Sequence, residues 1–175
     1  MIDKILNSKK IAIFGWPATG KSTLGEALSN KLEIPMYSLD LIRWKNSING
    51  KKDDEAFLKE YYKILECDNW IIEGNALDWI DERLNQADVL LFFESDTKTS
   101  INNFIKREEK IKNLEEVRKS FDKENEETLD KTIEWIENRY SKKIEKLRLK
   151  LKDYKEKLVI LNNYNELNKI INELK

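Results

Sequence analysis

The sequence contains no histidine and a single cysteine, Cys67, among its 175 residues. Without histidine the chain cannot build a Ser-His-Asp triad or a histidine-ligated zinc site, and one cysteine forms neither an internal disulfide nor a four-cysteine zinc site. Any chemistry must therefore use carboxylates, lysine, arginine, hydroxyl groups and backbone dipoles. We expect Cys67 to be buried or half-buried rather than a nucleophile, because no histidine or second cysteine is present to activate or resolve it.

Glycine and proline are also scarce, and all five glycines and both prolines occur by Gly74. Turns after that point must rely on Asn, Asp and Ser. Long apolar runs are missing too: no stretch of 18 uncharged apolar residues occurs, and the apolar run near the N-terminus is too short for a signal peptide. We therefore expect no membrane association and a cytoplasmic location.

Neither sign of charge dominates, since 32 Lys and Arg stand against 33 Asp and Glu, giving a formal net charge of −1. This balance gives no support to binding of duplex nucleic acid, although a local basic patch stays open. Hydrophobic residues make up 40% of the chain, enough to bury a core. The length suits a single domain covering residues 1–175.

Short apolar runs alternate with helical patterns along the chain. The runs predict strands over Lys10–Phe14, Pro35–Leu39, Trp70–Ile72, Val89–Phe93 and Leu158–Leu161. The helical patterns cover Lys21–Leu32, Asp53–Cys67 and Glu166–Leu174. This alternation predicts an α/β fold with a doubly wound parallel sheet flanked by helices. Ligands of such sheets bind beyond the carboxyl ends of the strands, which draws attention to Gly15–Ser22, Asp40, Glu73–Asn75 and Glu94–Asp96.

The segment GWPATGKS, from Gly15 to Ser22, matches the phosphate-loop pattern G-x-x-x-x-G-K-[ST] and lies between a predicted strand and a predicted helix. Such a loop turns successive backbone N–H groups toward a polyphosphate, and the helix directs its positive dipole end at the same anion. We expect Lys21 to reach the β and γ phosphates, Ser22 to ligate Mg²⁺ and Thr23 to meet the α phosphate. The bulky Trp16 is expected to pack outward. The predicted nucleotide-binding residues are Gly15, Pro17, Ala18, Thr19, Gly20, Lys21, Ser22 and Thr23.

A nucleotide-processing site needs a second acidic group to hold Mg²⁺, at the end of a neighbouring strand. Glu73 is our first candidate, and Asp40 is the second. The alternative for each is an ordinary exposed strand-end carboxylate or a helix cap.

A sustained helical stripe occupies the second half of the chain. Its members are Leu129, Ile133, Ile136, Tyr140, Ile144, Leu147, Leu151, Tyr154 and Leu158. One helix over Glu124–Lys157 would span roughly 50 Å, more than the diameter of about 40 Å expected for a compact chain of this length. The helix must therefore bend, break or protrude. It is either a surface helix packing its stripe on the sheet, or a dimerising arm or mobile lid.

The order GWPATGKSTL, YSLDLIRW, NWIIEGN and ERLNQADVLLFF resembles the topology-modulation-protein group of adenylate-kinase-like P-loop proteins. The resemblance covers roughly residues 10–93 and the last strand and helix. It implies a five-stranded parallel sheet of the nucleoside-monophosphate-kinase type, an acceptor-binding insertion at residues 41–68 and a helical lid with long helices at about residues 97–155. Asp40 and Trp44 match the acceptor-side element, Glu73 matches the acid that faces Mg²⁺, and Arg83 matches an arginine before the fourth strand. The sequence departs from the group at Ser38, Arg43, Glu73 and Ala76.

The first functional hypothesis is an enzyme, a P-loop kinase moving the γ-phosphoryl group of ATP to a small acceptor, most simply a nucleoside monophosphate. Phosphoryl transfer requires positioning and charge stabilisation, so the lack of histidine is no obstacle. The expected catalytic residues are Lys21, Asp40, Arg83 and Arg107, and Arg118 and Arg139 are further lid candidates. Asp40 would hold or deprotonate an acceptor hydroxyl. The aromatic residues Trp44, Phe57, Tyr61 and Tyr62 either stack on a base or form plain core.

The second hypothesis is a nucleotide-binding regulator that engages a protein or DNA partner through its long helical segment. A basic stretch motivates it, comprising Lys142, Lys143, Lys146, Arg148, Lys150 and Lys152. Acidic residues interleave with this stretch, so its alternative is a solvated helix face. A monomer and a homodimer are both compatible with the sequence.

Overall fold

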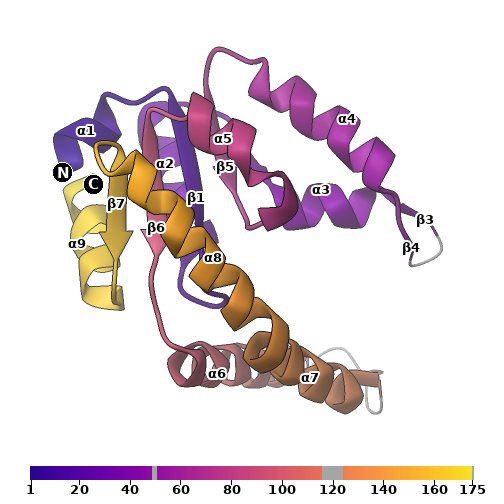
Figure 1. The fold of residues 1–175 in the computed structure, drawn as a ribbon. Helices are drawn as coiled ribbons and strands as arrows, with labels where there is room; N and C mark the ends of the chain where they lie inside the picture. The colour runs from indigo at the N-terminus through magenta and orange to yellow at the C-terminus, as the bar shows by residue number, and fades with distance from the viewer. Residues whose placement is uncertain (49–50, 116–123, 175) are drawn as a thin grey trace.

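The computed structural model describes residues 1–48, 51–115 and 124–174. A five-stranded sheet has the order β2-β5-β1-β6-β7, and all its neighbouring strands are parallel (Figure 1). The strands are β1 (Lys10–Gly15), β2 (Met36–Ser38), β5 (Trp70–Glu73), β6 (Val89–Phe93) and β7 (Leu158–Leu161). A separate antiparallel pair consists of β3 (Ser47–Ile48) and β4 (Lys51–Lys52). The predicted five-stranded parallel α/β sheet is confirmed.

Helices connect the strands and cover the sheet. They are α1 (Ile2–Leu6), α2 (Lys21–Leu32), α3 (Leu39–Lys45), α4 (Asp54–Leu65), α5 (Ile80–Gln86), α6 (Thr97–Glu115), α7 (Glu124–Trp135), α8 (Ser141–Leu151) and α9 (Tyr164–Leu174). Shorter helical turns are η1 (Leu77–Trp79), η2 (Ile136–Tyr140) and η3 (Lys152–Tyr154).

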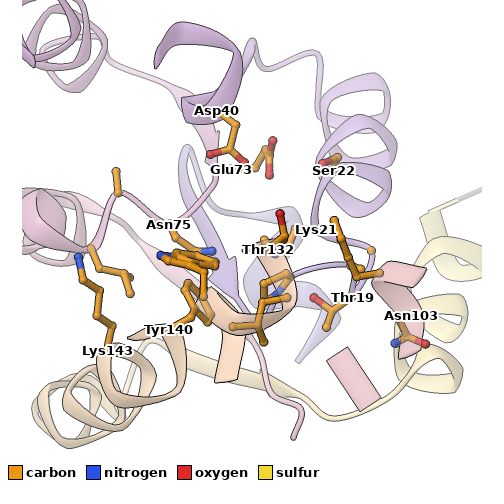
Figure 2. A pocket seen from close by; sticks show the side chains of 18 of the residues that line it. Thr19, Lys21, Ser22, Asp40, Glu73, Asn75, Asn103, Thr132, Tyr140 and Lys143 are labelled. Atoms are coloured by element: carbon orange, nitrogen blue, oxygen red, sulfur yellow. The ribbon is translucent and has the colours of Figure 1, made fainter. Parts of the chain in front are cut away.

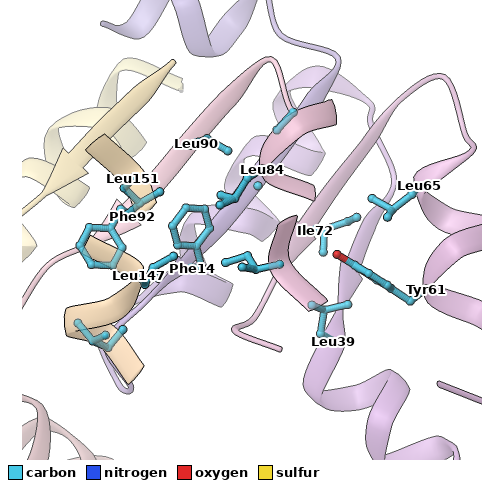
Figure 3. Packing of buried hydrophobic residues seen from close by; sticks show 14 of the residues in the cluster. Phe14, Leu39, Tyr61, Leu65, Ile72, Leu84, Leu90, Phe92, Leu147 and Leu151 are labelled. Carbon is cyan, nitrogen blue, oxygen red and sulfur yellow. The ribbon is translucent and has the colours of Figure 1, made fainter. Parts of the chain in front are cut away.

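The central strands are buried on both faces, which explains their near-continuous apolar sequences. In β1, Ile11 and Ile13 join a cluster with residues of α1, α2 and α9, whereas Phe14 joins the opposite cluster with residues of α4, α5 and α8. Figure 3 shows the second cluster, with Leu147 and Leu151 of α8 close to the rings of Phe14 and Phe92. The two layers hold the carboxyl ends of the strands at one edge of the molecule.

The long helical stripe is divided in the structure. Between α7 and α8, η2 forms a π-helical turn, and the stripe residues Ile136, Tyr140, Ile144, Leu147 and Leu151 are all buried in the core. The part from Ile136 to Leu151 therefore packs on the sheet, as the surface-helix alternative predicts. Helix α7 continues beyond the sheet (Figure 1), and α6 contacts the turn η2 that follows α7.

Three local expectations are wrong. Strand β2 ends at Ser38, because Leu39 and Asp40 already form the first turn of α3, so Asp40 is a helix residue rather than a strand-end residue. Cys67 is exposed, because it lies in the turn that follows the last residue of α4. Trp16 does not pack outward, since only 2% of its surface is accessible.

Candidate active site

The loop from Gly15 to Ser22 joins β1 to α2, and two glycines are needed for its path. Gly15 has φ +126°, and a Cβ there would lie 2.2 Å from the Phe93 carbonyl oxygen. Gly20 has φ +95°, and a Cβ there would lie 2.5 Å from Cδ2 of Leu167. Both conformations are costly for residues with a side chain, so the loop depends on glycine at these two positions.

The second half of the loop presents open hydrogen-bond donors. The N–H of Trp16 donates to the Phe93 carbonyl oxygen at 3.0 Å, but from Ala18 to Thr23 the backbone N–H groups have no acceptor within the described part of the chain. The N-terminus of the twelve-residue helix α2 adds its positive dipole end at the same place. Oriented N–H groups at a helix N-terminus form a binding site for an anion such as phosphate.

Lys21 begins α2 and turns back onto the loop. Its Nζ donates a hydrogen bond of 2.6 Å to the Trp16 carbonyl oxygen, which also accepts one of 2.7 Å from the Thr19 hydroxyl. Burial lowers the pKa of Lys21 to about 8, although the negative charges of Glu73 and Asp40 raise it and the charge of Arg107 lowers it further. A bound polyphosphate would raise this pKa again, because it favours the charged ammonium group.

Two carboxylates face the loop from neighbouring elements. Glu73 ends β5, is only 4% exposed and accepts a 2.6 Å hydrogen bond at Oε1 from the hydroxyl of Ser38, its register partner on β2. Asp40 lies in the first turn of α3, and Figure 2 shows its carboxylate beside that of Glu73, with Ser22 across the open space.

Two carboxylates and the Ser22 hydroxyl are oxygen ligands of the kind that Mg²⁺ uses when phosphate oxygens and waters complete its coordination. The residues that the structure describes contain no group of three or more His, Cys, Asp or Glu side chains placed to hold a metal on their own.

These groups line one cleft of about 660 Å³ (Figure 2). Every predicted nucleotide-binding residue from Pro17 to Thr23 lies in its wall, together with Asp40, Glu73 and Arg107. The remaining lining residues are Arg43, Asn75, Ala76, Leu77, Asp78, Trp79, Asn103, Phe104, Thr132, Trp135, Ile136, Tyr140, Lys143 and Tyr164.

The predicted arginines separate into different positions. Arg107 lies in the cleft wall with its guanidinium 5.0 Å from the Phe104 ring centroid. Arg83 lies behind the cleft, which corrects the expectation that it reaches the phosphates. It is fully buried and donates to the carbonyl oxygens of Gly74 (2.9 Å) and Asn75 (2.7 Å).

Of the two further lid candidates, the structure describes one. Arg139 is exposed and does not line the cleft, and Arg118 lies outside the described residues.

Because Arg83 bonds two carbonyl groups directly after β5, it can shape the cleft only through the backbone there.

Several lining residues come from the second half of the chain, where no local sequence motif points to them. Tyr140 belongs to the apolar stripe, which predicts a core residue, and Lys143 belongs to the basic stretch. Their sequence signals describe helix faces, whereas their place in the cleft depends on how η2 and α8 dock on the sheet. Asn75, in contrast, lies two residues after the end of β5, within the strand-end segment that the sequence singles out.

The aromatic residues of the 41–68 segment are divided between core and surface. Phe57 and Tyr61 are fully buried, which confirms the core interpretation for these two. Trp44 and Tyr62 are exposed, at 79% and 40%, and neither lines the cleft. Arg43 does line it, with its guanidinium near the ring centroids of both Phe57 (4.4 Å) and Trp79 (4.9 Å) and paired with Asp54.

Comparisons with known proteins agree with this architecture. The shikimate kinase from Bacteroides thetaiotaomicron superposes with a TM-score of 0.52 at 19% identity, covering 95% of this chain and 96% of that one. The gluconokinase from Sinorhizobium meliloti 1021 gives a TM-score of 0.51 at 14% identity, covering 95% and 89% of the two chains. At these identities the likeness establishes the fold, which is that of P-loop proteins of the nucleoside-monophosphate-kinase type.

Comparison of sequences gives a match over a shorter part of the chain. The uncharacterized protein YqaC from Bacillus subtilis (strain 168) is 32% identical over 89 residues, 48% of this chain and 48% of that protein. The match therefore spans about half the length of this curated relative. No protein-family model matches the chain. Within the described residues, no helix has the length and apolar character needed to cross a membrane.

Proposed function

We propose that the protein is a P-loop kinase that transfers the γ-phosphoryl group of ATP to a small acceptor, with a nucleoside monophosphate as the first candidate. The observation that carries the proposal is the row of open N–H groups from Ala18 to Thr23, which shares one cleft with Asp40 and Glu73. An anion site beside paired carboxylates can bind a phosphate donor, a metal ion and an acceptor hydroxyl close to one another.

On the donor side, the loop N–H groups would bind the β and γ phosphates while Lys21 leaves the Trp16 carbonyl oxygen to meet the same anion. Ser22 and Glu73 would hold Mg²⁺, which supplies neutralisation of charge on the phosphate oxygens. Arg107 would add positive charge from α6. These residues orient the nucleotide and stabilise the charge that develops during transfer, which is the main demand of this reaction.

On the acceptor side, Asp40 would accept the proton of the attacking hydroxyl or hold that hydroxyl in line. Arg43, three residues later on the same helix, packs against two aromatic rings and lines the cleft, so it fits an anionic group such as the phosphate of a nucleoside monophosphate. Under this proposal the 41–68 segment binds the acceptor, and the 97–155 segment supplies both a helical lid and long helices of a single domain. We further propose membership of the topology-modulation-protein group, which rests on the sequence motifs.

The proposal is tested by incubating the purified protein with Mg·ATP and a panel of acceptors, and measuring ADP release. The panel should contain the nucleoside monophosphates, and also shikimate and gluconate, the substrates in the names of the two structural neighbours. We expect turnover that depends on one acceptor, is abolished by Lys21→Ala and falls at least about 100-fold in Glu73→Gln.

Lys31→Ala is the matched control, because Lys31 is an exposed lysine in the last turn of the same helix α2. This variant should keep the wild-type rate. ATP binding without acceptor-dependent turnover would contradict the kinase proposal, as would turnover that survives in Lys21→Ala.

A further inference from the structure

The entry to the phosphate loop is fixed on several sides by hydrogen bonds from distant parts of the chain. The N–H of Gly15 donates to Oδ1 of Asn75 at 2.9 Å, and the N–H of Trp16 donates to the Phe93 carbonyl oxygen at 3.0 Å. The peptide between Gly15 and Trp16 therefore has a set orientation. The open N–H groups follow directly after it, so their direction depends on this peptide.

Tyr140 completes the fixation from the other side. Its hydroxyl donates a 2.7 Å hydrogen bond to the Gly15 carbonyl oxygen, across 125 positions of sequence, and only 1% of the residue is exposed. Burial raises the pKa of Tyr140 well above its ordinary value, and the negative charge of Asp40 raises it further. The hydroxyl therefore keeps its proton and remains a donor at all physiological pH values.

Tyr140 is the last residue of the π-helical turn η2. Turns of this kind redirect side chains within a helix and occur often at functional sites. Here the neighbouring residues Ile136 and Ile144 stay in the core while the Tyr140 hydroxyl reaches the loop.

A second, independent contact holds the Trp16 side chain. The indole Nε1 donates to Oε1 of Glu94 at 3.1 Å, and Arg148 of α8 binds the same carboxylate through Nε (2.8 Å) and a terminal nitrogen (2.5 Å). Partial burial alone would raise the pKa of Glu94, but hydrogen bonds from Arg148, Ser95 and Trp16 lower it overall. Glu94 thus stays ionised and links α8 to the loop.

In the free protein, Trp16 also holds two side chains of the loop. Its carbonyl oxygen accepts the hydrogen bonds of both Thr19 and Lys21, and its ring meets the Tyr140 ring edge-on with centroids 5.9 Å apart. We propose that Tyr140 and the Glu94–Arg148 pair are positioning residues, which hold the phosphate loop in its anion-binding shape through Gly15 and Trp16. This inference rests on the proposed function, because it assumes that the loop binds ATP.

The test compares ATP binding by Tyr140→Phe and Tyr154→Phe in the full-length chain, using isothermal calorimetry without an acceptor. Tyr154 is the matched control, since its hydroxyl bonds Oδ1 of Asn85 on the surface and does not contact the loop. We expect the Kd for ATP to rise about 5- to 10-fold in Tyr140→Phe, the effect of losing roughly one hydrogen bond, and to stay within twofold of wild type in Tyr154→Phe.

Glu94→Gln and Arg148→Met keep the inference testable if Tyr140→Phe folds poorly. Each substitution should raise the Kd for ATP about threefold or more. The Kd of the double variant should not exceed the higher of the two single-variant values, because the two residues act as one unit. In every variant kcat at saturating ATP should change less than the Kd, since the reacting groups are intact.

The outcomes separate the two proposals. Suppose that the wild-type protein binds ATP and that the variants Tyr140→Phe and Glu94→Gln bind it with the same Kd. The positioning inference is then wrong and the proposed function stands. If the variants lower only the melting temperature and leave the Kd unchanged, the contacts are merely structural and the inference is again wrong. If wild type does not bind ATP, the proposed function fails and the inference fails with it.

Discussion

At the scale of single residues, Lys21 lies in an environment that disfavours its own charge. Its burial lowers its pKa from 10.5 to about 8 in the folded chain, so folding works against the charged form. The unfolded chain keeps the proton up to the higher value. The destabilisation is therefore complete below pH 8 and disappears as the pH rises toward 10.5.

We predict that Lys21→Met stabilises the free protein while it abolishes ATP binding. At pH 7 the free energy of unfolding should rise by about 2 kcal/mol, because the buried charge is removed and its apolar stem is kept. The gain should shrink between pH 8 and pH 10.5. Urea unfolding of both proteins across this pH range measures it, and a variant less stable than wild type at pH 7 would contradict the prediction.

Arg83 shows why a residue's neighbours in sequence do not give its role. It comes shortly after the Glu73 element, so a direct contact with phosphate is a reasonable expectation from the chain order. In the fold, its guanidinium lies under the backbone of Gly74 and Asn75. The planar group with several donors satisfies two carbonyl groups at once, each through its own terminal nitrogen.

At the scale of elements, α8 decides how the long helical stripe is used. Leu147 is 4% exposed and belongs to the core cluster under the sheet, whereas Leu149, two residues later, is 62% exposed. Residues two apart on a helix point to different sides, so the two leucines probe opposite faces of the same element.

We predict that Leu147→Ala lowers the free energy of unfolding by about 2–4 kcal/mol, the usual cost of deleting a buried leucine side chain. Leu149→Ala should change it by less than about 0.5 kcal/mol, because its side chain is already in solvent. Chemical denaturation of the two variants measures both values. Equal effects would mean that the stripe does not pack on the sheet as described.

At the scale of the whole molecule, the cleft gathers residues from both ends of the chain. Tyr164 of α9 donates a 2.8 Å hydrogen bond to the Ala18 carbonyl oxygen, and Ser100 of α6 donates one of 3.0 Å to the Pro17 carbonyl oxygen. A nucleotide bound here would contact elements that the unfolded chain cannot hold together. Binding should therefore stabilise the whole fold.

We predict that Mg·ATP at about 100 times its Kd adds roughly 2.7 kcal/mol to the free energy of unfolding, which corresponds to a rise in Tm of about 5–10 °C for a chain of this size. Adenosine, which lacks the phosphates, should give almost no shift, and neither should Mg·ATP with Lys21→Ala. Thermal unfolding followed by intrinsic fluorescence measures all three. An equal shift with adenosine would show that the phosphate loop is not the main contact.

The sequence alone determined the features that depend on local patterns. The apolar runs placed three strands to within one residue at each end and two, Val89–Phe93 and Leu158–Leu161, without error, and the spacing of Gly15, Gly20, Lys21 and Ser22 located the loop that joins β1 to α2. These predictions succeed because a strand buried on both faces and a loop that must expose its N–H groups each need particular residues at neighbouring positions.

Only the tertiary structure decided the partners of that loop. Tyr140 contacts Gly15, and Arg148 is linked through Glu94 to Trp16, although these residues lie far apart in the sequence. Arg83 lies behind the cleft, where its place in the chain does not predict it. Helical periodicity identifies which face of a helix is apolar, but it does not determine how that helix is placed on the sheet. The side chains that complete the cleft are selected by this packing, which depends on the whole fold.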